Sequence, residues 1–168
     1  MPSPTYDSAP DPAVSLRSLL ASSRVAALAA SSPDGPVSAM VALAFSPDFR
    51  HAFLHLSSLS SHKNLLLLNP LCSLLVHDPD DGRPQPLLLR RAALTGTASL
   101  IPKDSPDFPA ASSRYLDQLP ASRLMFSLPD FDLFRISLLS IRYVEGFGRA
   151  FSLTPDQWAL PANPALSS

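Results

Sequence analysis

The stretch HLSSLSSHKN, residues 55–64, lies where a strand-like run of the chain gives way to a helix-like run. Residues 52–56 are typical of a strand, and residues 59–69 carry serines followed by leucines, with Pro70 placed to end a helix. A strand that leads directly into a helix points free backbone N–H groups outward at the positive end of the helix dipole. The stretch therefore predicts a strand-to-helix junction that favours an anion.

The chain before this junction predicts one helix and a meander of three strands. Residues 13–22 have apolar side chains at helical spacing, and Pro12 suits the first turn of a helix. Two apolar runs, residues 24–30 and 37–45, flank an Asp-Gly turn signal and form a hairpin. A second turn, over residues 46–50, leads into the third strand.

The chain after the junction continues with strands and short helices. We predict a fourth strand over residues 72–77, a polar loop over 78–86, a fifth strand over 87–101 that bends at Gly96, two short helices between 105 and 127 divided by Pro120, a closing strand over 131–147, and a short helix or lid over 151–160. This order indicates one antiparallel barrel with peripheral helices over residues 13–160, between a disordered arm (1–12) and a tail (161–168).

Charge and composition exclude several function classes. The 13 basic and 14 acidic residues form no block of one sign, so nucleic acid is not an expected partner. Cys72 is the only cysteine, and the four histidines lack the spacing of a helical zinc site, so no metal centre is expected. The first twelve residues have no basic charge, and residues 65–76 are too short to span a bilayer; a cytoplasmic protein without membrane contact is expected.

Three segments carry candidate chemistry. In the junction, serine hydroxyls, His62 and Lys63 can together hold a phosphate; the alternative is that Ser60 or Ser61 only caps the helix and Lys63 is a solvated surface charge. Small side chains over residues 38–42 let a planar ring approach the backbone, or simply form a barrel strand. Residues 145–150, Glu-Gly-Phe-Gly-Arg-Ala, form a tight turn able to project Phe147 and Arg149 into a pocket or interface.

Taken together, these three segments resemble one family, the pyridoxamine 5'-phosphate oxidase-like FMN-binding split barrels, and within it the haem-utilisation branch. The resemblance covers roughly residues 16–150, and its fold is mainly β (α+β), an antiparallel six-stranded split β-barrel with peripheral helices. It implies an FMN site built from the second strand and the junction: Ser38, Met40 and Val41 line the flavin ring, Ser61 and Lys63 hold the phosphate, Ser57 and Ser58 contact phosphate or ribityl oxygens, and His62 and Asn64 border the pocket.

The resemblance also implies a function. It predicts an FMN-dependent oxidoreductase acting on a small-molecule substrate, as a homodimer with flavin sites at the subunit interface. The alternatives are a non-catalytic flavin or haem binding protein, and a reductase that uses the deazaflavin F420 on the same fold. Vitamin B6 oxidases of this family carry an arginine where residues 38–40 are Ser-Ala-Met, and haem-degrading relatives use a histidine in the C-terminal region, whereas the last histidine here is His77.

Overall fold

The computed structural model describes residues 11–161, so nearly all of the expected arm (1–12) and tail (161–168) lies outside the described residues. In chain order the elements are α1 Pro12–Ser22, β1 Val25–Ser32, β2 Gly35–Phe45, β3 His51–Ser57, α2 Ser61–Leu68, β4 Leu71–His77, the 3-10 helix η1 Pro86–Leu88, β5 Arg91–Ile101, α3 Phe108–Gln118, the 3-10 helix η2 Pro120–Ser127, β6 Phe131–Val144, β7 Ala150–Leu153 and α4 Pro155–Trp158. None of these helices is long and apolar enough to cross a membrane.

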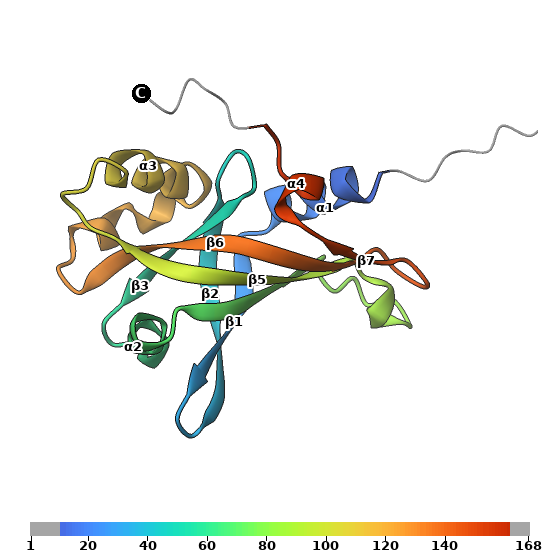
Figure 1. The fold of residues 1–168 in the computed structure, drawn as a ribbon, viewed down its shortest axis with the longest axis horizontal. Helices are drawn as coiled ribbons and strands as arrows, with labels where there is room; N and C mark the ends of the chain where they lie inside the picture. The colour runs from blue at the N-terminus through green and yellow to red at the C-terminus, as the bar shows by residue number, and fades with distance from the viewer. Residues whose placement is uncertain (1–10, 162–168) are drawn as a thin grey trace, which may run out of the picture.

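The strands form a closed antiparallel barrel, as the sequence predicts. Their order is β3-β2-β1-β4-β5-β6-β7, and an additional pairing of β3 with β6 closes the first six strands. Strand β6 pairs with β5 along almost its whole length, while its other edge pairs first with β3 and then, from Ile141 to Val144, with β7. Figure 1 shows β5 and β6 as the long strands that cross the molecule, with β7 beside their far end.

The core fills the barrel, because alternate residues of each strand point inward. Leu28, Leu54, Leu74, Leu94 and Ile136 are fully buried there. Helices α1 and α4 lie together over one end (Figure 1), where the buried indole of Trp158 donates a 3.0 Å hydrogen bond to the carbonyl of Phe49. Helices α3 and η2 cover the outside of β3 through a second apolar cluster that includes Phe53, Tyr115 and Leu133.

Three details differ from the predictions. The fifth strand begins at Arg91, because residues 86–88 form a 3-10 turn in a proline-rich segment that cannot supply every ladder N–H. Residues 151–153, predicted as part of a helix or lid, belong to β7 instead, since the edge of β6 beyond Ser137 has no other partner. In the first hairpin Gly35 already pairs with Ser32, so the turn is at residues 33–34 and β2 starts earlier than predicted.

Gly96 bends β5, as predicted. The register between β5 and β6 shifts at Thr95/Gly96, which is a β-bulge. A Cβ atom on Gly96 would lie 2.6 Å from Cγ2 of Ile136 and 2.8 Å from the carbonyl oxygen of Ser137. Strands β5 and β6 can therefore pack this closely here only because this residue has no side chain.

We expect Gly96→Ala to lower the free energy of unfolding by about 1–3 kcal/mol, because the added methyl group forces β5 away from β6. Urea denaturation followed by circular dichroism measures this loss. Ser140→Ala, an exposed change on the neighbouring strand, should stay within about 0.5 kcal/mol of the parent protein. An unchanged urea midpoint for Gly96→Ala would show that β5 and β6 can move apart without loss of stability.

Candidate functional site

The strand-to-helix junction lies where predicted, between the end of β3 at Ser57 and the start of α2 at Ser61. Ser60 takes the N-cap position, but its side chain makes no capping hydrogen bond. Instead, the serine hydroxyls before it bond to the start of β6: Ser57 donates 2.8 Å to the carboxylate of Asp130, and Ser58 donates 3.0 Å to the carbonyl of Asp130. The capping interpretation is therefore right that Ser60 is the N-cap residue, but wrong that its side chain makes a capping hydrogen bond.

Lys63 lies at the centre of the junction. Its side chain points inward and the residue is only 4% exposed, so the interpretation of Lys63 as a solvated surface charge is wrong. Its ammonium group contacts three oxygens: the carboxylate of Asp132 at 2.6 Å, the hydroxyl of Ser58 at 2.7 Å and the carbonyl of Asp130 at 3.2 Å. Each partner satisfies part of a buried charge that would otherwise be costly.

The charge of the junction is negative. Lys63 contributes one positive charge, and Asp130 and Asp132 contribute one negative charge each, so the sum is −1. Burial lowers the pKa of His62, which keeps its imidazole neutral at pH 7. The sequence did not predict that Asp130 and Asp132 lie at the junction, because the pairing of residue 56 with residue 132 depends on which strand closes the barrel.

The structure brings together only part of the predicted flavin site. Ser57, Ser58, Ser61, His62, Lys63 and Asn64 share the junction, with Ser61 and Asn64 exposed. Ser38 and Met40 lie on the outer face of β2, where Met40 is 81% exposed, whereas Val41 points into the barrel core. A contact between these residues and FMN remains a prediction.

The outer sheet face carries many small apolar residues, because alternate positions of its strands are mostly alanine, valine, leucine or methionine. In rows across β2, β1, β4 and β5, Met40 lies opposite Ala27, Ala27 opposite Leu75, and Leu75 opposite Ala93. We define the outer sheet face by its exposed and half-buried members: Val25, Ala27, Ala29, Met40, Ala42, Leu71, Leu75, Ala93 and Leu139.

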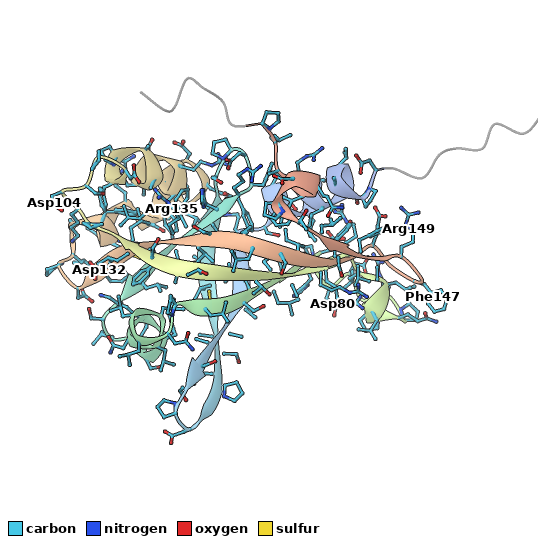
Figure 2. The ribbon with its side chains drawn as sticks, in the orientation of Figure 1. Asp80, Asp104, Asp132, Arg135, Phe147 and Arg149 are labelled. Atoms are coloured by element: carbon cyan, nitrogen blue, oxygen red, sulfur yellow. The ribbon has the colours of Figure 1, made fainter. Side chains whose placement is uncertain are left out.

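A cavity of about 830 Å³ lies at the hairpin between β6 and β7. Gly146 and Gly148 have positive φ angles of 123° and 73°, which a residue with a side chain rarely adopts. Arg149 and Glu145 close the loop with a 2.9 Å ion pair, and Phe147 between the glycines is 91% exposed. Figure 2 shows Phe147 and Arg149 at this hairpin, so the predicted turn and its link to a pocket are confirmed.

Two further arginines line the same cavity, and the sequence analysis missed both. Arg91 bonds to the carbonyl of Leu87 at 2.6 Å, and Arg142 bonds to the hydroxyl of Ser152 at 3.0 Å. Within residues 11–161 neither arginine pairs with a carboxylate. The sequence gives only a weak signal for them, because the two arginines are far apart in the chain and become neighbours only through the register of β5 and β6.

His77 lies beside this group, at the end of β4 and opposite Arg91. Its Nδ1–H donates a 2.6 Å hydrogen bond to the carbonyl of Asp78, because a carbonyl can only accept. The ring is exposed, and in the tautomer that makes this bond the lone pair is on Nε2. Such an imidazole is able to coordinate a metal ion.

His55 lies on the other side of the barrel, under η2. Its ring stacks on Phe126 with centroids 3.8 Å apart and contacts Phe131 and Tyr115. Burial, together with the positive charges of Lys103 and Lys63 and against the opposing effect of Asp132, lowers the pKa of His55 to about 4. His55 is therefore a neutral member of an aromatic cluster at pH 7.

Known proteins resemble this chain in sequence and in fold. A sequence model of the family described as pyridoxamine 5'-phosphate oxidase matches residues 15–145. "Non-canonical heme oxygenase HOZ, chloroplastic" from Arabidopsis thaliana is 37% identical over 99 residues, which are 58% of this chain and 28% of that protein.

Two solved structures extend the comparison. A heme binding protein from Mycobacterium smegmatis superposes with a TM-score of 0.79 at 25% identity, over 89% of this chain and 60% of that one. ChuZ from Campylobacter jejuni has a TM-score of 0.76 at 18% identity, over 87% and 60% of the two chains, and shows the fold alone. The chain thus spans less than two thirds of the length of each of these relatives.

We expect the stability of the protein to fall as the pH is lowered from about 6.5 to about 4. In this pH window the imidazole of His55 is protonated in the unfolded chain but stays neutral in the folded protein, so acid favours unfolding. The pKa of His51 is also lowered by burial and acts in the same direction. Urea unfolding at several pH values measures the slope, and His55→Phe should flatten it. His77→Ala, at an exposed position, should leave the slope unchanged; an unaltered slope in His55→Phe would contradict the assignment.

Proposed function

Because the chain belongs to the pyridoxamine 5'-phosphate oxidase family, we propose that it is a haem-binding member of that family. Two of the relatives, one similar in sequence and one in structure, are named for haem: the plant heme oxygenase and the mycobacterial heme binding protein. Because the chain covers only part of either relative, the proposal concerns haem binding, with turnover of the haem left to experiment. Bound haem would supply iron-centred redox or oxygen chemistry.

The observation that carries the proposal is the composition of the hairpin cavity. Its volume of about 830 Å³ is in the range of small-molecule sites. Leu87 and Phe147, which are 72% and 91% exposed, offer apolar surface to a planar macrocycle. Arg91 and Arg142, which pair with no carboxylate in the described part of the chain, offer charge-assisted hydrogen bonds to its two propionates.

His77 does not line the cavity but lies next to it, opposite Arg91, and is the side chain that would bind the iron. The hydrogen bond from its Nδ1 to the carbonyl of Asp78 leaves Nε2 available. Haem proteins commonly use a neutral imidazole held in this way. The chain would thus replace the C-terminal histidine of its haem-degrading relatives with a histidine from β4.

The junction argues against FMN as the preferred cofactor. Lys63 is the only cation among the residues that the family pattern assigns to the flavin phosphate, and Asp132 already pairs with it at 2.6 Å. FMN and F420 remain the alternatives, because the family includes flavin-binding members. Absorbance and mass spectrometry of the cofactor that copurifies with the protein separate haem, flavin and deazaflavin.

We further propose that two copies associate through the outer sheet face. Met40, Leu71 and Leu75 are 81%, 53% and 41% exposed on one continuous sheet, with exposed alanines between them. A large exposed apolar patch on a folded domain commonly marks an interface. A second copy would cover it with an identical face, as a twofold interface requires.

We expect the purified protein to bind haem with a Soret band typical of histidine ligation. Arg91→Ala and Arg142→Ala should each lower the affinity for haem by roughly tenfold. The affinity for haem dimethyl ester should be nearly unchanged, because the ester has no propionate charge. His77→Ala should change the Soret band itself. Arg123→Ala and His62→Ala serve as controls outside the cavity. A protein that takes up no haem, or a His77→Ala spectrum identical to the parent, would contradict the proposal.

We expect Met40→Asp to dissociate the dimer, because the substitution buries a carboxylate without a partner in each copy of the interface. Sedimentation equilibrium of the two proteins over a range of concentrations measures the change. Leu124→Asp, at a 76% exposed position on η2 away from this face, should keep the parent mass. A parent protein that is monomeric at every concentration would rule the interface out.

A further inference from the structure

The ammonium group of Lys63 has no donor left for a ligand. A lysine offers three N–H donors, and here Asp132, Ser58 and the carbonyl of Asp130 accept one each, at 2.6, 2.7 and 3.2 Å. The residue is 4% exposed, so solvent does not compete for these bonds. A phosphate arriving at the junction must displace one of these oxygens before it can bind the cation.

Asp132 is the partner that decides this competition. Ser58 and the carbonyl of Asp130 are neutral and can remain bound to Lys63 beside a phosphate, whereas the carboxylate of Asp132 repels one. Its side chain is 34% exposed, so a ligand can reach the pair from the Asp132 side. Together with Asp130, which bonds to Ser57 at 2.8 Å, Asp132 gives the junction its net charge of −1.

We propose that Asp132 is a specificity-determining residue that excludes phosphate from the α2 junction. It neutralises the one buried cation there, so the junction discriminates against the phosphate group of a phosphorylated ligand such as FMN. Removing the charge of Asp132 would convert the junction into a phosphate site. Asp132 lies at the start of β6 and Phe147 beyond its end (Figure 2), so this inference does not depend on where haem binds.

The substitution Asp132→Asn tests the proposal with the smallest change of shape. The amide keeps an oxygen that can accept from Lys63, so the packing of α2 against β6 is preserved. The charge of the junction rises from −1 to 0, and the ammonium group gains the freedom to exchange a weak partner for a phosphate oxygen. Ser58→Ala frees one donor of Lys63 while Asp132 keeps its charge, so this variant should still exclude phosphate and serves as a control.

We expect Asp132→Asn to bind FMN about ten- to a hundredfold more tightly than the parent protein, which is what one new charge-assisted hydrogen bond supplies. Riboflavin, which lacks the phosphate, should bind both proteins equally. Quenching of flavin fluorescence, extended to millimolar ligand, measures all four affinities. Inorganic phosphate should compete with FMN only in the variant. Asp107→Asn, which removes a carboxylate from the exposed pair with Arg135, is the matched control and should show no gain.

Three outcomes would overturn the proposal. These are no gain in FMN affinity by folded Asp132→Asn, an equal gain for riboflavin, or a parent protein that already prefers FMN to riboflavin by more than tenfold. Thermal unfolding of each variant establishes that it is folded. If Asp132→Asn does not fold, Asp132→Ser decides: a gain confined to FMN supports the proposal, and unchanged affinities overturn it. Haem titration of Asp132→Asn should match the parent, which separates this test from that of haem binding.

Discussion

Strand β6 is the constraint on which the rest of the molecule depends. Its 14 residues pair with β5 on one edge, and on the other edge they pair with β3 in the first half and β7 in the second. The first pairing closes the barrel and sets Asp132 beside the junction. The pairing with β7 holds the hairpin of Phe147, and the pairing with β5 places Arg142 near Arg91. A strand of ordinary length could close the barrel but could not position both sites.

The buried lysine shows how this constraint acts on chemistry. Lys63 is on a short helix that the chain places after β3, and its ammonium group would be costly to bury alone. The start of β6 supplies a carboxylate and a carbonyl at the required distance, because Leu56 and Asp132 are directly paired residues of β3 and β6. The fold therefore satisfies the lysine internally, and its role toward a ligand depends on the oxygens that already hold it.

Local signals predicted most of the fold, and long-range pairing accounts for what they missed. Pro12, Pro70 and Pro120 marked helix boundaries correctly, and Gly96 marked the bend in β5, because each acts through its own backbone. The four residues of β7 form a strand only because β6 offers a free edge, which no local pattern reports. In the same way, Lys63 was recognised as a functional candidate, but its partner Asp132 lies on a strand whose neighbour the sequence does not specify.

The two ends of β6 differ in charge, and this difference carries the functional argument. At one end, Asp130 and Asp132 outnumber Lys63, so an anionic group meets a surface of its own sign. At the other end, Arg91 and Arg142 lack carboxylate partners among the described residues, and only Arg149 is neutralised, by Glu145. Both ends belong to one rigid barrel, so a ligand with an apolar body and acidic groups is favoured at the hairpin and disfavoured at the junction. On the proposals made above, charges gathered at the two ends of β6 discriminate between ligands that the shared fold would otherwise admit alike.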